Sequence, residues 1–453
     1  MLRDIRTDSS KDKKMVEAEK KFTMSGGESD AAEVDSAPRH TGIFPCQTIR
    51  EMVRSGEITA TTDITDDQIQ PASIDLRLGA YAYPVTTSFL PGHGVSVLEK
   101  MKQLDPHFED YKIPLANDNG TGALLEKNRV YVIPLMESIK LRSEHTALAN
   151  PKSSTGRLDI LTRLIVDGAT KFDEVTDCYA GQLYIEVAPR SFSIVVKAGA
   201  RLNQLRFQRS RGEAPKPITD DDWKQLLQDG QIVRTQEEVV EITPAPLIDL
   251  LYEKQSAEAA NGERKNKFSR NRGMLPFHID LKGSGKKDEL IGWRSKENAG
   301  RIDLNRRDYD PYDFWEPIII RKEPSLILDP NRFYILMTQE SIGVPPDYAA
   351  EMLPYDTRAG EFRVHYAGFF DPGFGWDSTT GTAGSSRAVL EVRSHEVPFL
   401  LEHGQLVGWL KYERMAARPD TLYGQAGASN YQGQGLKLAK QFLPMGHIGK
   451  NAN

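Results

Sequence analysis

The chain has 453 residues, enough for two or three domains, and its 39% hydrophobic and 27% charged residues are normal for a globular protein. Its net charge of −6 gives no basic footprint, so we expect no nucleic-acid polymer as partner. No apolar run approaches bilayer length and no signal-peptide core is visible, so we expect no membrane partner and a cytoplasmic location. The two cysteines, Cys46 and Cys178, lack the spacing of a disulfide framework or a metal site.

The first elements follow a polar tail. Residues 1–41 are rich in Lys, Glu, Asp, Ser and Gly with few apolar anchors, which predicts disorder. Residues 47–55 carry apolar side chains at helical spacing. Residues 69–79 then alternate like a strand, and a further strand is predicted at residues 181–187.

Residues 152–157, Lys-Ser-Ser-Thr-Gly-Arg, gather groups that suit phosphate oxygens. The segment supplies a point charge, hydroxyl donors and a bidentate guanidinium within six residues. It is not a Walker A loop, which needs two glycines before Lys-Ser/Thr. Such a turn, taken alone, is more often structural than functional.

A turn and a strand near the C-terminus carry the second candidate site. Asp371-Pro-Gly is a turn signal, because proline pre-sets φ and glycine tolerates positive φ. Residues 387–392 alternate like a strand, yet Glu391 stands between Leu390 and Val392. A carboxylate buried there tends to acquire a raised pKa, which suits proton transfer. The alternative is a strand whose polar edge faces water.

The second half of the chain repeats the order of the first. Several matches in one order indicate a tandem repeat of one β-rich domain, and the tail after it could close over a ligand. We predict repeats at residues 42–210 and 272–418, a helical or polar connector at 211–271, and a lid and tail at 419–453. The matching pairs are residues 70–79 with 274–283, Asn128-Arg-Val-Tyr with Asn331-Arg-Phe-Tyr, Glu137-Ser-Ile with Glu340-Ser-Ile, Ile185-Glu-Val with Leu390-Glu-Val, and residues 199–205 with 404–410.

Taken together, these motifs resemble those of the dCTP deaminases of the dUTPase-like superfamily, in a long form with the domain duplicated. Family members share a Lys/Arg-Ser-Ser-x-x-Arg segment, an Ala-Gly-x-x-Asp-Pro-Gly-Phe turn and a Leu-Glu strand, matched here at residues 152–157, 367–374 and 390–391. Their C-terminal lid carries a Tyr and a Lys-Tyr-x-x-Gln pattern, although Asn430 replaces the lysine here. The resemblance implies an all-β fold with minor helices, built as two tandem distorted β-barrels.

The resemblance also implies roles for individual residues. Glu391 would be the general acid/base, with Ser153, Arg157 and Arg358 as further catalytic candidates. The substrate-binding candidates are Lys152, Ser154, Ala367, Asp371, Val389, Tyr423 and Gln434.

Neither repeat is complete by the family pattern. The first repeat has the phosphate segment and Glu186 but no lid, whereas the second has Asp371, Glu391 and the lid. Family sites form between neighbouring domains, which suggests one composite site. Arg358 stands at the right distance from Asp371 to be the family arginine, while superposition of the repeats places Gly360 opposite Arg157.

The expected reaction is hydrolysis of dCTP to dUTP and ammonia in pyrimidine nucleotide metabolism. Zinc deaminases need a His/Cys ligand pattern that is missing here, so we expect no zinc, and Mg²⁺ bound only with the triphosphate. The resemblance implies dCTP and dUTP as small-molecule partners and a homo-oligomer, such as a trimer. Two alternatives stay open: a dUTPase-type or bifunctional activity that ends in dUMP, and a non-catalytic nucleotide-binding regulator.

Overall fold

The computed structural model describes residues 41–116, 120–209, 218, 222, 225–226, 228–230, 232–234, 274–286, 288–354, 362–365, 368–394, 397–425 and 435–444. Strands dominate these residues and the helices are short, which confirms the predicted all-β class. Residues 38–453 form one compact unit, to which both repeats belong. In the part of the chain described, no helix is long and apolar enough to cross a membrane.

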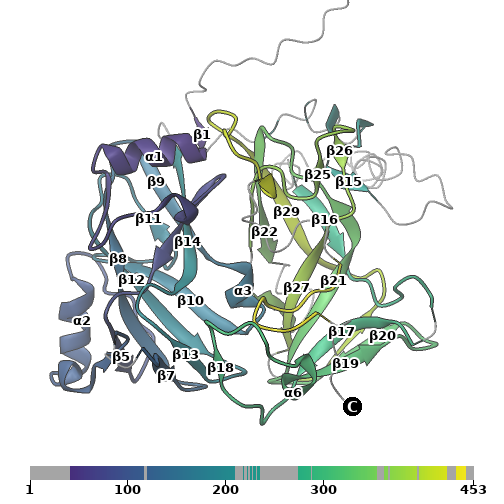
Figure 1. Cartoon of the computed structure of the whole chain (residues 1–453), viewed down its shortest axis with the longest axis horizontal. Coiled ribbons are helices and arrows are strands. Elements are labelled where there is room, and N and C mark those ends of the chain that lie inside the picture. The colour runs from purple at the N-terminus through teal and green to yellow at the C-terminus, as the bar shows by residue number, and fades with distance from the viewer. Residues whose placement is uncertain are drawn as a thin grey trace, which may run out of the picture. The chain divides into compact units, whose positions relative to one another are not determined.

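The first repeat runs from purple to teal in Figure 1. Its helical segments are α1 (Cys46–Arg54), η1 (Asp66–Gln68), α2 (Val97–Leu104), η2 (Phe108–Tyr111) and α3 (Ser153–Gly156). Its strands are β1 (Gly42–Ile43), β2 (Ile58–Ala60), β3 (Ile69–Gln70), β4 (Ser73–Arg77), β5 (Tyr81–Val85), β6 (Ile113–Pro114), β7 (Ala123–Leu125), β8 (Val130–Lys140), β9 (His145–Pro151), β10 (Ile160–Val166), β11 (Glu174–Val175), β12 (Ala180–Pro189), β13 (Ile194–Val196) and β14 (Arg201–Arg209).

The second repeat runs from green to yellow in Figure 1, after the short strand β15 (Val233–Arg234). It has one described helix, α6 (Pro311–Phe314). Its strands are β16 (Met274–His278), β17 (Leu290–Ser295), β18 (Ile302–Asp303), β19 (Trp315–Ile319), β20 (Ser325–Leu328), β21 (Phe333–Ile342), β22 (Tyr348–Pro354), β23 (Phe362–His365), β24 (Phe369–Phe370), β25 (Trp376–Asp377), β26 (Thr382–Ala383), β27 (Arg387–Ser394), β28 (Phe399–Glu402) and β29 (Leu406–Arg414).

Each repeat is built from two main sheets that share an apolar core. In the first repeat the sheet orders are β11-β9-β14-β4-β3 and β10-β12-β8-β5-β6, and Leu205 and Ile185 of the two sheets belong to one buried cluster. In the second repeat the orders are β16-β29-β22-β24 and β19-β17-β21-β27-β23, with Leu410 and Leu390 in one cluster. Alternating strands bury one face in such a sandwich-like core.

The repeat predicted from the sequence is visible in detailed geometry. Asn128 and Asn331 both adopt positive φ, at 63° and 61°, in the turns before β8 and β21. Asparagine tolerates this left-handed conformation better than most residues. Three residues later, Tyr131 and Tyr334 each accept a backbone N–H on the hydroxyl oxygen, at 2.9 and 2.8 Å. The matching Asn-Arg-x-Tyr segments therefore build the same local structure twice.

One predicted match between the repeats is wrong. The backbone N–H groups of Leu78 and Ile279 donate to matching carbonyls at the start of each closing strand, at 2.9 and 3.0 Å, so these two residues correspond. The predicted match of residues 70–79 with 274–283 rested on Ile74-Asp-Leu and Ile279-Asp-Leu, and so paired Asp75 with Asp280. In the structure, Asp75 corresponds to Pro276 instead. The shared Ile-Asp-Leu letters hid the offset, because an alternating strand pattern looks the same after a shift by an even number of residues.

Candidate functional site

Strand β27 is buried on both of its faces. Side chains alternate along a strand, so its two faces meet different surroundings. One face joins the core of the second repeat through Ala388, Leu390 and Val392. The other face points toward the first repeat, where Val389 joins the first repeat's apolar cluster. Glu391 lies on this second face and is buried, with 5% exposure.

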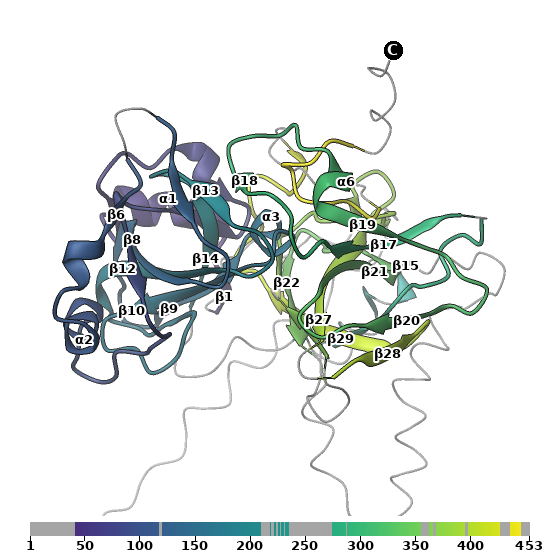
Figure 2. The ribbon, with the colours of Figure 1, turned by 90° about the horizontal axis from the view of Figure 1, so that it is seen from below.

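Glu391 lies against helix α3 of the first repeat. A methyl group added at Gly156 would stand 3.0 Å from both carboxylate oxygens of Glu391. Burial raises the pKa of Glu391 from 4.5 to about 8, the positive charge of Arg157 opposes this rise, and Asp159 adds to it. Figure 2 shows α3 between the strands of the two repeats. The absence of a side chain at Gly156 is thus what leaves room for the carboxylate.

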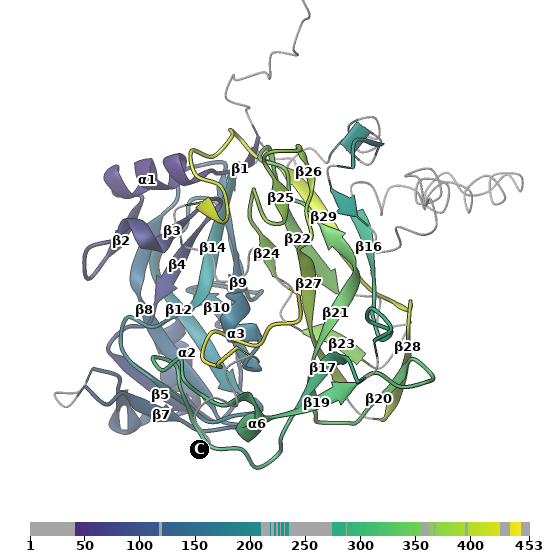
Figure 3. The same cartoon turned by 45° about the vertical axis from the view of Figure 1, so that its right-hand side comes forward.

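Helix α3 is a single turn anchored to strand β14. The backbone N–H of Lys152 and the Thr155 hydroxyl both donate to the Leu202 carbonyl, at 3.0 and 2.8 Å. The turn ends at Arg157, whose guanidinium is buried and donates to the Lys437 carbonyl at 2.7 Å. Figure 3 shows this C-terminal segment, in yellow, beside α3. Three distant parts of the sequence therefore meet around one arginine.

An ion pair between the repeats lies beside Glu391. Arg393, two residues along the same face of β27, reaches Asp159 of the first repeat at 2.5 Å. The Ser191 hydroxyl also donates to Asp159, at 2.6 Å. Asp159 and Arg393 are both buried. This pair holds β27 against the first repeat.

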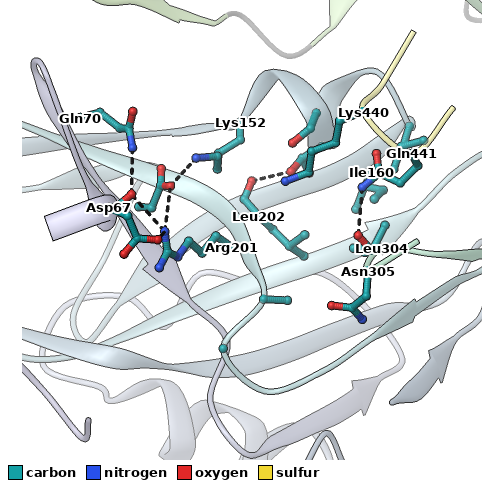
Figure 4. A pocket seen from close by; sticks show the side chains of 16 residues that line it. Asp67, Gln70, Lys152, Ile160, Arg201, Leu202, Leu304, Asn305, Lys440 and Gln441 are labelled. Atoms are coloured by element: carbon teal, nitrogen blue, oxygen red, sulfur yellow. Dashed lines mark hydrogen bonds and ion pairs between the residues drawn. The ribbon is translucent and has the colours of Figure 1, made fainter. Parts of the chain in front are cut away.

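On the first repeat, α3 also borders a cavity of about 420 Å³. Figure 4 shows Lys152, Arg201 and Lys440 around it. Hydroxyls of Ser154 and Thr155 belong to its lining, whereas Ser153 is exposed and is not part of it. The remaining lining residues are Asp67, Gln70, Asp75, Leu158, Ile160, Gly199, Ala200, Leu202, Leu304, Asn305 and Gln441.

The cations of this cavity are only partly neutralised. Lys152 forms an ion pair with Asp75, and Arg201 with Asp67 at 2.8 Å. Among the described residues, Lys440 has no ion pair. Burial is the larger cause that lowers the pKa of Lys440, and the positive charge of the nearby Lys152 lowers it further. Lys440 is half-buried, and an anion would favour the charged form of such an ammonium beside other cations. The cavity is therefore suited to a polyanionic ligand.

Asp371 ties the Asp-Pro-Gly turn to the first repeat. Arg206 of β14 donates to Asp371 at 3.2 Å and stacks on Phe369, with 4.0 Å between guanidinium carbon and ring centroid. Burial raises the pKa of Asp371, and the charges of Arg206 and Lys152 oppose the rise. Asp371 thus lies within electrostatic reach of the cavity.

Tyr423 lines a separate cavity of about 270 Å³ together with Cys46 and Arg50. Its ring packs against Phe374, with 5.5 Å between the centroids. Asp67 and Gln70 line both cavities, so the two adjoin. The start of the predicted lid is therefore docked beside the candidate site.

Three predicted site residues, Arg358, Ala367 and Gln434, lie outside the described residues. The strand register matches Pro151 with Pro354, because they pair with corresponding residues of β14 and β29. A gap-free continuation places Gly360, not Arg358, opposite Arg157; Gly360 also lies outside the described residues. The role of Arg358 stays a prediction.

Comparisons with known proteins agree on one family. Family models of the N-terminal and C-terminal domains of 2'-deoxycytidine 5'-triphosphate deaminase match residues 40–211 and 249–442. The crystal structure of 2'-deoxycytidine 5'-triphosphate deaminase from Agrobacterium tumefaciens is 43% identical, with a TM-score of 0.69, over 83% of this chain and 100% of that one. The chain belongs to the dCTP deaminase family.

Curated dCTP deaminases match over one repeat-sized stretch. A "dCTP deaminase, dUMP-forming" of Sulfurihydrogenibium sp. is 28% identical over 179 residues, 39% of this chain and 88% of that protein. A "dCTP deaminase" of Acidianus ambivalens is 26% identical over 158 residues, 34% of this chain and 77% of that protein. The name of the first relative specifies dUMP as the product, whereas the name of the second specifies no product.

Sequence reasoning missed four charged residues of this dCTP deaminase family site: Asp159, Arg201, Arg206 and Lys440. None belongs to the motifs that carry the resemblance. Asp159 and Arg206 gain partners only when the repeats pack together, Lys440 comes from the C-terminal segment, and Arg201 pairs with Asp67 within the first repeat. Among the described residues, no group of three or more His, Cys, Asp and Glu side chains is placed to hold a metal ion.

Proposed function

We propose that the protein hydrolyses dCTP to dUTP and ammonia at a composite site between its two repeats, with Glu391 as general acid/base. The observation that carries the proposal is the Glu391 carboxyl, which is buried against Gly156 and Arg157 with its pKa raised to about 8. A carboxyl that titrates near neutrality can accept a proton and return it within one reaction cycle.

In this proposal, Glu391, Arg157 and Ser153 have separate roles in deamination. The cytosine ring would bind at the edge of the contact between α3 and β27, with its amino-bearing carbon near Glu391. Glu391 would take the proton that the attacking water loses and deliver it to the departing amino group. The buried Arg157 would stabilise the charge that develops on the tetrahedral intermediate, and the exposed Ser153 would hydrogen-bond the water.

The triphosphate would occupy the cavity beside α3. Its oxygens match the ammonium groups of Lys152 and Lys440, the guanidinium of Arg201 and the hydroxyl of Ser154. Mg²⁺ would enter as part of the nucleotide substrate. We propose that no zinc takes part, so a zinc-selective chelator should leave the rate unchanged, whereas removal of Mg²⁺ should weaken nucleotide binding.

A second candidate is a bifunctional reaction that ends in dUMP. Several relatives are named dUMP-forming, and one of them is 30% identical over 119 residues. Asp75 also supports this candidate, because its Oδ1 atom is buried at the cavity and has no hydrogen-bond partner among the described residues. Such a carboxylate oxygen could hold a water for attack on the α-phosphate.

A product assay tests the proposal. Purified full-length protein would be incubated with dCTP and Mg²⁺, and ammonia, dUTP, dUMP and pyrophosphate would all be quantified. We expect ammonia and dUTP in equal amounts; dUMP with pyrophosphate would establish the bifunctional reaction instead. Glu391→Gln keeps the shape but cannot accept the proton, so kcat should fall about 100-fold or more while dCTP still binds. If the wild type bound dCTP but released no ammonia, the result would favour a non-catalytic nucleotide-binding regulator.

A further inference from the structure

We infer that each chain builds one nucleotide site. The first repeat has blocked its own glutamate, and the second repeat has lost the charged residues that line the cavity, so each repeat supplies only one half of a site. The inference rests on the proposed function, since it concerns the same composite site. It goes further by identifying the residues that remove the second site, which the internal repeat would otherwise provide.

Glu186 is the first repeat's counterpart of Glu391. Each glutamate stands in a strand with a neighbour on both sides, β12 between β10 and β8, and β27 between β21 and β23. Glu186 pairs with Val132 of β8, and Glu391 pairs with Ile335 of β21. Val132 and Ile335 correspond, because each directly follows the tyrosine of its Asn-Arg-x-Tyr segment. Both glutamates are buried. The two repeats thus place a carboxyl at the same point of the fold.

The first repeat neutralises its glutamate internally. Arg163, the cross-strand neighbour of Glu186, donates to Oε1 from Nε at 3.0 Å and from a terminal nitrogen at 2.5 Å. The guanidinium stacks on Phe172, 3.8 Å from the ring centroid, and donates to the Ser88 hydroxyl at 2.7 Å. A carboxylate held in such a charge-assisted pair is poorly suited to exchange protons with a substrate. In the second repeat, His365 is the cross-strand neighbour of Glu391.

The same face of the first repeat is also covered by its own chain. Tyr184, two residues before Glu186 on that face of β12, packs in one apolar cluster with Val97 and Met101 of α2. The matching face of β27 carries Val389, Glu391 and Arg393 and packs against the other repeat instead. Figure 1 shows α2 beside the first repeat's strands, near β5. Helix α2 therefore packs on the face of β12 whose counterpart on β27 meets α3.

The second repeat has lost the opposite half. Pro276 stands where the first repeat has Asp75, as the register of Leu78 and Ile279 requires. By the register of the closing strands, which matches Leu205 with Leu410, Leu406 replaces Arg201. Two of the charged residues that line the phosphate cavity are therefore apolar in the second repeat. Each repeat retains what the other one lacks.

Nucleotide stoichiometry tests this inference. The full-length Glu391→Gln variant would be titrated with dCTP and Mg²⁺ by calorimetry, and equilibrium dialysis with labelled dCTP would check the result. We expect one dCTP per chain. Two bound per chain would overturn the inference, whether or not the wild type releases ammonia, so this outcome is separate from failure of the proposed function.

Matched glutamate variants give the kinetic counterpart. Glu186→Gln should retain the full rate of ammonia release, whereas two equal centres would lose about half of it, since half of the catalytic groups would be gone. Arg163→Gln/Glu186→Gln removes both charges together and covers the case in which the single change unfolds the first repeat. A rate reduced by half in this double variant, with Glu391→Gln also keeping half, would show two working centres.

Discussion

Glu391 owes its proposed chemistry to burial by two repeats at once. A glutamate in an exposed strand would titrate near its ordinary pKa, and a glutamate paired with arginine would stay ionised. Glu391 meets a guanidinium that opposes its protonation, yet burial prevails and its pKa rises to about 8. The carboxyl is therefore poised between its two protonation states near neutral pH.

The raised pKa predicts the pH dependence of activity. If the ionised carboxylate begins the cycle, kcat/KM should rise with pH until about 8, and at pH 6 it should lie about 100-fold below its plateau. Steady-state ammonia release between pH 5.5 and 9, at constant ionic strength, measures the profile. A flat profile above pH 6 would mean that Glu391 titrates like an exposed glutamate.

The same shift has a consequence for stability. The folded pKa lies above the ordinary value of 4.5, so the folded protein holds an extra proton between 4.5 and about 8. The stability that this carboxyl contributes is complete below 4.5 and is lost as the pH rises through 8. Thermal unfolding should thus lose more stability between pH 5 and 8 in the wild type than in Glu391→Gln.

Lys440 should separate triphosphate binding from chemistry. Lys440→Met keeps the aliphatic stem and removes the charge, so the KM for dCTP should rise about 10- to 100-fold with little change in kcat. Turnover of deoxycytidine, which has no phosphate, should be unaffected. Lys171→Met is the matched control, because Lys171 pairs with Glu174 on the surface and does not line the cavity. An unchanged KM would show that Lys440 does not bind the triphosphate.

At the scale of elements, the proposed catalytic site is the contact between α3 and β27. An added methyl group at Gly156 of α3 would stand 3.0 Å from the Glu391 carboxylate, and Arg157 follows Gly156 directly. Arg393 and Asp159 fix the same two segments a few residues away. The position of one short turn therefore determines the distance between the carboxyl and the arginine.

Replacing Gly156 tests that contact. Gly156→Ala has no backbone penalty, because φ is not positive there and alanine favours helices, but its methyl group would stand 3.0 Å from the carboxylate. The Glu391 carboxyl must shift, so kcat should fall at least about 10-fold, while the melting temperature should stay unchanged. In Gly300→Ala the added methyl is 4.0 Å from its nearest neighbour, so this variant should be fully active. Normal kcat in Gly156→Ala would show that the contact is not needed.

The sequence predicted individual turns and strands more reliably than it predicted which distant residues contact one another. The Asn-Arg-x-Tyr and x-Glu-Val matches hold in the register, because a left-handed turn and a central strand leave clear local patterns. The match of Asp75 with Asp280 failed, since alternation cannot reveal an even-numbered shift. Lys440 and Arg206 act only across the packed repeats, and no local pattern reports such contacts.

At the scale of the whole molecule, duplication lets the two copies specialise. The first repeat has Arg157 and borders the cavity proposed for the triphosphate, and the second has Glu391 on a strand buried against the first repeat. Specialisation also makes the site depend on the packing of the repeats. The domain boundaries and the homo-oligomer stay predictions; light scattering after size-exclusion chromatography would measure the assembly.

The most direct test of a composite site is a double-mutant cycle on the rate of ammonia release from dCTP. Arg157→Ala, Glu391→Gln and their combination would be compared with the wild type, with circular dichroism to verify folding. We expect Arg157→Ala to lose about 10- to 100-fold and the double variant to lose clearly less than the product of the single losses, because the two groups serve one substrate. Near-normal activity in Arg157→Ala, or fully multiplicative losses, would contradict a shared site.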